Sequence, residues 1–488
     1  MEVLSELQPK AVFHYFEELC AIPHGSGNTK AVSDWCAAFA KARGLEYHQD
    51  ALNNIIIIKE AAPGYEGAEP VILQGHLDMV CEKEPGCPKD LEREGLDLEA
   101  DGDFVTARGT TLGGDDGIAV AMALAALEAE DLPHPRLEVV LTTGEEIGML
   151  GAVALEPTML QGRMMLNIDS EVEGVFTVSC AGGVRATSHV PVAYETVNGV
   201  FCGVIIKGLI SGHSGVEIHK GRANANLLMG RVLSALTAEL PVHLAAIVGG
   251  QADNAIANEC VATMVLREAD LERAAAIVTA LGETFRREYQ TADPGLTVEW
   301  RQDPRAEDHE AVTTAESARR VADALLLLPH GIQTWSMDIP GLVQTSLNLG
   351  VARMAAGELT ATFAVRSSLA SEKQWVCDRI ERLTALLGGH VSYVGDYPAW
   401  EYQKDSPLRD LVTDVYRRQY GQEPVIEAIH AGLECGVFAG KLPGLQCISF
   451  GPNLLEIHTV REKMDVASVQ RTWTMLQEIL RRTKELKR

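Results

Sequence analysis

The sequence lacks the features that mark several large classes of protein. It has no apolar run near the roughly 18 residues of a membrane-spanning helix, and its acidic, amphipathic start lacks the basic and apolar segments of a signal peptide. Its 10 cysteines show no paired CxxC spacing, so we expect buried thiols and no disulfides. No repeat of fixed period is present. These absences favour a globular protein of the cytoplasm.

Positive charge is also scarce. Lys and Arg number 42 against 68 Asp and Glu, which gives a formal net charge of −26. A chain this acidic repels phosphate backbones and anionic membranes, so we expect neither nucleic acid nor a membrane as a partner. Most of the charge is expected to be a solvated surface. The charge therefore says more about excluded partners than about a substrate.

The length and the apolar patterning predict an α/β protein of more than one domain. A chain of 488 residues exceeds one compact core. Four apolar runs, at residues 70–74, 137–143, 164–168 and 445–450, have the length of strands buried on both faces. The Ala/Leu-rich residues 117–130 between the first two runs favour a buried helix. Strands that alternate with helices predict a mostly parallel sheet.

The middle of the chain has a different pattern. Residues 201–209, 260–266 and 358–368 resemble strands, and residues 223–239 resemble a helix. This pattern predicts a second, α+β domain inserted into the first. We place the split catalytic domain at residues 1–183 and 394–488, and the inserted domain at residues 184–393.

Acidic and histidine side chains follow each of the four predicted buried strands. In chain order they are His76 with Asp78, Glu145 with Glu146, Asp169 and, after a loop, His458, while Asp115 opens the predicted helix between the first two strands. Ligands of open parallel sheets bind at the carboxyl ends of the strands, so we expect these side chains on one rim. Two histidines and three carboxylates suit two Zn²⁺ or similar divalent ions.

The chemistry suggests a role for each residue, although each motif alone is weak. A carboxylate can bridge two metals, and Asp115 is the natural candidate. Glu145 and Glu146 are adjacent, so their side chains diverge, and one can bind metal while the other acts as a general base. Asp78 can orient the imidazole of His76. An isolated HxD, a Glu-Glu pair or a loop histidine is usually accidental or structural, but the joint pattern predicts a metal site.

Longer motifs then carry a resemblance. Residues 75–80 (GHLDMV), 107–117 (ARGTTLGGDDG), 143–146 (TGEE) and 167–170 (NIDS) resemble the M20 metallopeptidase family. Residues 179–183 (SCAGG), 212–215 (GHSG), 224–226 (NAN) and 430–436 (HAGLECG) are similar to its aminoacyl-histidine dipeptidase branch, also called cytosolic nonspecific dipeptidases or peptidase D. The resemblance spans nearly the whole chain.

The resemblance implies a phosphorylase/hydrolase-like zinc peptidase domain with an inserted lid domain, and a homodimer. It implies two Zn²⁺ per chain, with Co²⁺ or Mn²⁺ as substitutes. By this resemblance Asp115 bridges the ions, His76 and Asp169 complete one site, and Glu146 and His458 complete the other. Glu145 is then the general base, Asp78 the partner of His76, and the peptide between Asp115 and Asp116 is cis.

The resemblance implies hydrolysis of unblocked L-dipeptides, including Xaa-His, by a zinc-bound hydroxide, with His213 as the candidate donor to the oxyanion. The chemistry of other residues suggests further contacts with the substrate. Arg366 could hold the substrate carboxylate bidentately, with a surface or structural arginine as the alternative interpretation. Asn254 is a weaker candidate, and His219 and His430 receive no role.

Several other functions fit part of this pattern. A tripeptidase or an N-acyl-amino-acid deacylase would use the same metals. A two-metal phosphoesterase is disfavoured by the acidic charge, and a binding protein would not need Glu145. Two segments depart from the branch: His458 is followed by Thr459 and Val460 where Ser-Pro is usual, and Ala257 stands where Pro is usual.

Overall fold

The chain folds into two compact units. The structure is a computed structural model, and it describes residues 3–302 and 311–486. Unit 1 comprises Met1–Cys180, Trp400–Ala428 and Leu433–Arg488, and unit 2 comprises Ala181–Ala399 and Ile429–Gly432. The sequence placed the inserted domain at residues 184–393, without the short second segment that adds His430 to unit 2.

Unit 1 is built on a mixed sheet that has eight strands within the described residues, in the order β1-β2-β6-β3-β7-β21-β8-β20. The strands are β1 (Glu46–Gln49), β2 (Ile55–Lys59), β3 (Val71–His76), β6 (Leu137–Thr142), β7 (Met164–Asn167), β8 (Val175–Cys180), β20 (Val425–Ile429) and β21 (Gln446–Ser449). The four apolar runs of the sequence are the neighbours β6, β3, β7 and β21, and they pair parallel. The predicted parallel core is confirmed, with antiparallel strands β1, β2 and β8 beside it.

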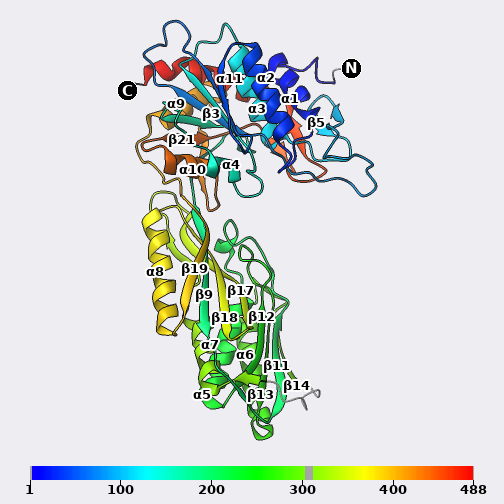
Figure 1. Cartoon of the computed structure of the whole chain (residues 1–488), viewed down its shortest axis with the longest axis vertical. Coiled ribbons are helices and arrows are strands. Elements are labelled where there is room, and N and C mark those ends of the chain that lie inside the picture. Colours follow the sequence, from blue (N-terminus) through cyan, green and yellow to red (C-terminus); the bar gives the residue numbers. More distant parts are fainter. Residues whose placement is uncertain (1–2, 303–310, 487–488) are drawn as a thin grey trace. The chain divides into compact units, whose positions relative to one another are not determined.

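Helices cover this sheet on both sides. They are α1 (Lys10–Cys20), α2 (Lys30–Ala42), α3 (Gly114–Glu128), α4 (Leu150–Ala154), α9 (Pro407–Tyr420), α10 (Glu434–Lys441) and α11 (Val466–Arg482). In Figure 1, α1, α2 and α3 lie on one side of the sheet, and α9 and α11 lie on the other. Every residue of β3 and β6 is therefore buried. Helix α3 packs between α1 and β3, which explains its Ala/Leu-rich sequence.

A small second sheet of unit 1 positions one loop of the site. It pairs β22 (Leu454–Leu455), β23 (Lys463–Asp465), β5 (Phe104–Ala107) and β4 (Leu98–Ala100). The loop between β22 and β23 carries His458, and the chain after β5 leads into α3. Because β23 pairs with β5, His458 is held near the start of α3.

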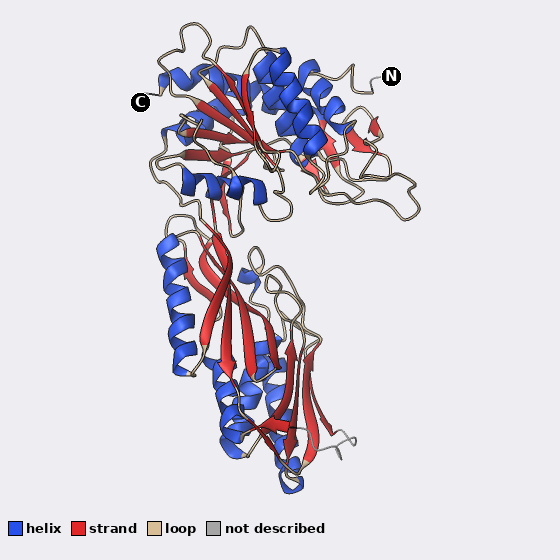
Figure 2. Cartoon of the chain, viewed as in Figure 1, coloured by secondary structure: helices blue, strands red, loops and turns tan. Residues whose placement is uncertain are grey.

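Unit 2 is an antiparallel sheet covered by helices, as Figure 2 shows. Its strands run in the order β14-β11-β13-β12-β17-β18-β9-β19, with β16 on β17 and a separate pair of β10 and β15. The strands are β9 (Gly182–Pro191), β10 (Tyr194–Thr196), β11 (Val200–Lys207), β12 (His243–Gly249), β13 (Cys260–Leu266), β14 (Thr297–Gln302), β15 (Ala311–Thr313), β16 (Gly331–Trp335), β17 (Val343–Ala355), β18 (Glu358–Ser367) and β19 (His390–Tyr397). The three strands predicted for this region correspond to β11, β13 and β18.

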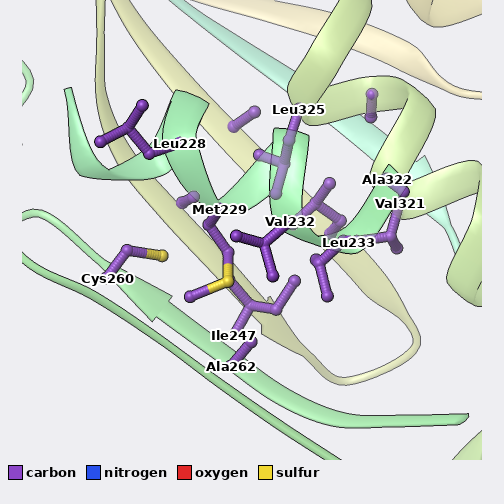
Figure 3. Close-up of a cluster of buried hydrophobic side chains, with 14 of the residues drawn as sticks. Leu228, Met229, Val232, Leu233, Ile247, Cys260, Ala262, Val321, Ala322 and Leu325 are labelled. Atoms are coloured by element: carbon purple, nitrogen blue, oxygen red, sulfur yellow. The ribbon is translucent and has the colours of Figure 1, made fainter. Parts of the chain in front are cut away.

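The helices of unit 2 share one apolar core with its sheet. They are α5 (Ala225–Glu239), α6 (Leu271–Glu288), α7 (Ala315–Leu327) and α8 (Ala370–Leu386). Figure 3 shows Met229 and Val232 of α5 between Ile247 of the sheet and Leu325 of α7. Strand β11 alternates buried and half-buried residues, because only one face of the sheet meets this core.

Two expectations from composition are met by the described residues. All 10 cysteines are free thiols, and most are buried. None of the helices within residues 3–302 and 311–486 has the length and apolarity needed to cross a membrane.

Candidate metal centre

Unit 1 brings the five predicted metal ligands together at the carboxyl ends of its parallel strands. His76 ends β3, Glu146 follows β6, and Asp169 follows β7. Asp115 lies in the first turn of α3, and His458 lies in the loop between β22 and β23. These positions follow from the topology, because parallel strands end at the same edge of a sheet.

The carboxylate of Asp115 lies between two imidazoles. Its Oδ1 is 3.1 Å from Nε2 of His76, and its Oδ2 is 3.1 Å from Nε2 of His458. Each imidazole nitrogen also faces a second carboxylate: Asp169 Oδ1 lies 3.7 Å from His76 Nε2, and Glu146 Oε1 lies 2.9 Å from His458 Nε2. Asp115 therefore lies beside both imidazoles, and it groups with Glu146 and His458 closely enough to hold a metal ion.

The carboxylates and imidazoles of this rim favour the binding of a cation. The hydrogen bonds of His458 with Asp115 and Glu146 raise the pKa of its imidazole to about 10. Burial lowers the pKa of His76, but Asp115 and Asp169 outweigh burial and hold that pKa well above its ordinary value. Burial raises the pKa of Asp169. Metal ions would replace the imidazolium protons as the positive charge, so metal binding should release protons.

Asp116 is a buried carboxylate beside these ligands that the sequence analysis left without a role. It groups with His76 and Asp169 closely enough to hold a metal ion, and the peptide joining it to Asp115 is cis. Its Oδ2 accepts a 3.2 Å hydrogen bond from the backbone N–H of His76, and burial raises its pKa well above the ordinary value. Position 75 must be glycine, because a Cβ there would lie 2.5 Å from Asp116 Oδ2.

Glu145 is an acid of this rim whose pKa lies far above its ordinary value. Burial, together with the charges of Asp169, Glu434 and Glu146, raises the pKa of Glu145 to about 9. Its backbone N–H donates to Asp78 Oδ1 at 3.1 Å. Cations bound beside Glu145 would lower this pKa, as a general base requires at neutral pH.

Asp78 contacts His76 mainly through its backbone. The backbone carbonyl of Asp78 accepts from Nδ1 of His76 at 2.8 Å, whereas its carboxylate lies 3.8 Å from that nitrogen. The carboxylate is engaged elsewhere, since it accepts from Ser26 Oγ at 2.8 Å and from the backbone of Glu145. The side chain of Asp78 therefore links the end of β3 to Glu145.

The loop of His458 is anchored by Glu462, which the sequence analysis missed. The buried carboxylate of Glu462 accepts hydrogen bonds from the backbone N–H groups of Leu112, Gly113 and Gly114 at 2.8, 3.1 and 2.8 Å. This contact ties the loop of His458 to the segment that leads into Asp115. It holds the loop of His458 in place, and nothing in the spacing of a lone glutamate could have revealed it.

A second missed residue, Glu434, lies in the interior of unit 1. Its Oε2 accepts from Gln74 Nε2 at 2.5 Å and from Thr142 Oγ1 at 2.6 Å, and Gln74 in turn accepts from Asn167 at 2.6 Å. Burial raises the pKa of Glu434 to about 7. The network joins the ends of β3, β6 and β7, and the motif HAGLECG was the available signal.

The predicted lid residues lie in unit 2, where Gly215 separates His213 from Arg366. A Cβ at Gly215 would lie 3.0 Å from His213 Cε1 and 3.2 Å from Arg366 Nε. Arg366 donates from Nη1 to the hydroxyl of Tyr397 at 3.1 Å, and its buried Nε has no partner among the described residues. Asn254 is exposed, and its carbonyl accepts from the backbone N–H of Ser214 at 2.8 Å.

His430, which received no role from the sequence, belongs to the same cluster. Its Nε2 lies 2.7 Å from Ser346 Oγ. Burial and the charges of Arg366 and His213 lower the pKa of His430 to about 3. Burial and Arg366 also lower the pKa of His213. This cluster of unit 2 is thus suited to an anion, with Arg366 as its permanent charge.

Comparison with known proteins agrees with the geometry. The sequence pattern of Peptidase family M20/M25/M40 matches residues 72–482. The chain belongs to this peptidase family. It is 36% identical over 488 residues to the cytosol non-specific dipeptidase of Escherichia coli (strain K12), with 99% of each chain covered.

Solved structures of M20 proteins share the fold. The crystal structure of aminoacylhistidine dipeptidase from Vibrio alginolyticus is 34% identical, with a TM-score of 0.91, and the match covers 98% of this chain and 97% of that one. Aminopeptidase PepT from Bacillus cereus ATCC 10987 has a TM-score of 0.55 at 15% identity, over 98% of this chain and 99% of that one, which shows the fold alone. The predicted M20 membership and fold class are confirmed.

Proposed function

We propose that this M20 metallopeptidase hydrolyses unblocked L-dipeptides, including Xaa-His, at a two-metal centre in unit 1. The observation that carries the proposal is the carboxylate of Asp115, with one oxygen toward His76 and the other toward His458. The relatives named cytosol non-specific dipeptidase and aminoacylhistidine dipeptidase support this substrate class. The name of the first relative also supports a cytoplasmic location.

The residues at the rim fit two Zn²⁺ ions, with Co²⁺ or Mn²⁺ as substitutes. Asp115 would bridge them, His76 and Asp169 would complete one site, and Glu146 and His458 would complete the other. Imidazole nitrogens and carboxylate oxygens are ligands that these ions accept. When bound, such ions polarise a scissile carbonyl and activate a water molecule.

Glu145 would carry the proton through the reaction. It accepts a proton from the attacking water and later gives it to the leaving amine, as a single carboxyl group can when it is not a ligand. Cations bound beside Glu145 would lower its pKa from about 9, so that the carboxylate can accept the proton of the attacking water. The carboxylate of Asp78 accepts from the backbone N–H of Glu145 and from Ser26 Oγ, so its role would be to position the base.

Residues of unit 2 are further candidates for contact with the substrate. Arg366 has a buried Nε with no partner among the described residues, and a substrate carboxylate would satisfy it bidentately. His213, whose pKa is lowered by burial and by Arg366, would donate to the oxyanion. Asn254 is a further candidate for substrate contact. We propose a homodimer, in which His213 acts either on its own chain or on its partner.

The test is a substrate panel on the purified, metal-loaded protein. We expect rapid hydrolysis of Ala-His, slow hydrolysis of a tripeptide and of acetyl-alanine, and none of nitrophenyl phosphate. Cleavage of acetyl-alanine as fast as Ala-His would replace the dipeptidase by a deacylase on the same metals. Hydrolysis of the phosphate ester alone would remove the peptidase mechanism.

A further inference from the structure

A cavity in unit 1 opens beside the metal centre and is not used by the mechanism above. Its volume is about 670 Å³, within the roughly 300–1,000 Å³ range of small-molecule sites. Residues 25–28, 79–81, 91–93 and 146–147 form its walls. Glu146, a proposed ligand, is therefore part of the wall, so the cavity begins at the metal centre.

The walls of this cavity combine apolar side chains with the polar residues Ser26, Asn28, Glu92, Arg93 and Glu146. Met79, Val80 and Leu91 line it, and Ile147 follows the two glutamates directly while remaining 56% exposed. Cys81 completes this wall, and it is an exposed cysteine in a chain whose other thiols are buried or half-buried. An apolar ligand group would remove these surfaces from water.

Cys81 packs against Gly25, another residue that lines the cavity. A Cβ at position 25 would lie 2.6 Å from Cys81 Sγ, so only glycine lets the thiol pack there. Gly25 forms a parallel bridge with Met79, and the backbone N–H of Ser26 donates to the carbonyl of Met79 at 3.2 Å. The segment that contains Gly25 and Ser26 is thus joined through its backbone to the segment that contains Met79 and Cys81.

The same wall is bonded to the proposed catalytic residues. Ser26 Oγ donates to Asp78 Oδ2 at 2.8 Å, and the backbone N–H of Glu145 donates to Asp78 Oδ1 at 3.1 Å. A group that fills the cavity therefore contacts a loop held by the carboxylate that positions the base.

We infer that this cavity takes the side chain of the N-terminal residue of the substrate, and that Cys81 limits how large that side chain can be. The inference rests on the proposed dipeptidase function. The Cα of the N-terminal residue is bonded to the scissile carbonyl, so its side chain must lie within a few ångströms of the metal ligands. Met79, Val80, Leu91 and Ile147 in the wall suit aliphatic, thioether and aromatic side chains.

The test compares Cys81→Phe with Cys87→Phe. Cys87 is half-buried on a separate cavity formed by residues 84–89 and 108–109, which makes it a matched control. For each protein kcat/KM is measured on Ala-Ala, Leu-Ala and Phe-Ala, and on the mirrored peptides Ala-Leu and Ala-Phe. In Cys81→Phe the ratio of Phe-Ala to Ala-Ala should fall by about tenfold or more, because overpacking by a ring excludes a second ring. In the same variant the ratio of kcat/KM for Ala-Phe to that for Ala-Ala should be unchanged. In Cys87→Phe the Phe-Ala to Ala-Ala ratio and the Ala-Phe to Ala-Ala ratio should both be unchanged.

The outcomes separate the two hypotheses. If Cys81→Phe lowers all five rates equally, or if it changes the Ala-Leu and Ala-Phe ratios instead, the cavity does not hold the N-terminal side chain, and the dipeptidase stands. If the metal-loaded wild type cleaves none of the five peptides, both the proposed function and the inference fall.

Chemical labelling gives a second test that needs no folded Phe variant. In a Cys87→Ala background, N-ethylmaleimide should modify Cys81: the sulfur bonds to one alkene carbon, the π bond breaks, and the other carbon takes the thiol proton. Burial and Glu82 raise the pKa of this thiol, so labelling is done at mildly alkaline pH. Hydrolysis of Phe-Ala should fall more than that of Ala-Ala, and Phe-Ala should slow the labelling. An adduct on Cys81, mapped by mass spectrometry, that leaves the Phe-Ala to Ala-Ala ratio unchanged would overturn the inference.

Discussion

His458 in unit 1 and His430 in unit 2 are the same residue type with opposite properties. The carboxylates of Asp115 and Glu146 raise the pKa of His458 to about 10, whereas burial and the charges of Arg366 and His213 lower that of His430 to about 3. Neighbouring charge and burial decide both directions. One unit therefore presents a rim of carboxylates and imidazoles that suits cations, and the other presents an arginine with neutral histidines that suits an anion.

The comparison indicates a division of labour. The carboxylates of unit 1 are costly to bury together unless positive ions accompany them. The unpartnered Nε of Arg366 in unit 2 is similarly costly until a carboxylate reaches it. Unit 1 thus has side chains that suit a cation, and unit 2 has an arginine that suits a carboxylate.

The largest effect should come from removing the base in unit 1. Glu145→Gln keeps the shape of the side chain but cannot carry a proton, so kcat for Ala-His should fall by roughly three to four orders of magnitude. Steady-state kinetics measure it. Glu171→Gln is the control, because burial also raises the pKa of that nearby acid, to about 7, yet the mechanism gives it no role. Full activity in Glu145→Gln would remove the base from the account.

The anion cluster of unit 2 should set substrate length. The wild type should prefer dipeptides to tripeptides and to N-acyl amino acids by at least about a hundredfold in kcat/KM, or about 2.7 kcal/mol, because a longer peptide leaves Arg366 unpaired. Arg366→Ala should raise KM and narrow the gap between a dipeptide and its amide.

Arg320→Ala serves as the control for this series, since Arg320 pairs with Glu316 on α7. If the wild type cleaves tripeptides as fast as dipeptides, Arg366 does not limit the length of the substrate. The metal centre of unit 1 would be unaffected by that result.

Mixing two inactive variants asks whether the two units act within one chain. Glu145→Gln retains His213, and His213→Ala retains the base. If His213 acts on the partner of a homodimer, one of the two sites in each mixed dimer is intact, so a mixed dimer should have about half of wild-type activity. After random subunit exchange about half of the dimers are mixed, so the whole mixture should have about a quarter. Silent mixtures in which subunit exchange is verified by mass would place both groups in one chain.

The smallest effect concerns stability and pH in unit 2. The pKa of His430 in the folded protein, about 3, lies below that of an exposed imidazole, so the unfolded chain binds the proton first as pH falls. The stability linked to this histidine is therefore lost between about pH 7 and pH 3. Thermal unfolding of wild type and His430→Gln should show a Tm difference that shifts in favour of the variant from pH 7.5 to about pH 5.5. A constant difference would mean that His430 does not stay neutral.

The parallel core could be predicted from the sequence because its signals are local. Strands β3, β6, β7 and β21 are short, continuous apolar runs, and the position of a ligand after each run follows from the pattern alone. His76, Asp115, Glu146, Asp169 and His458 accordingly lie together in the structure.

Residues that act through long-range contacts could not be predicted in this way. Glu462 meets Leu112 about 350 positions away, and Glu434 meets Gln74 across 360 positions. His430 is separated from Ser346 by 84 positions. No spacing rule links such pairs, because the fold and not the local sequence brings them together. Asp78 shows the same limit, since its carboxylate serves Ser26 and Glu145 more closely than His76.

The metal content of three proteins tests the central claim most directly. Mass-spectrometric metal analysis of wild type, Glu145→Gln and Asp115→Ala, each purified with zinc, measures how many ions each chain retains. The account predicts two ions in the wild type and in the inactive Glu145→Gln, and loss of both in Asp115→Ala, because Asp115 is shared by the two sites. Metal loss in Glu145→Gln would exchange the roles of Glu145 and Glu146, and two retained ions in Asp115→Ala would contradict the bridge.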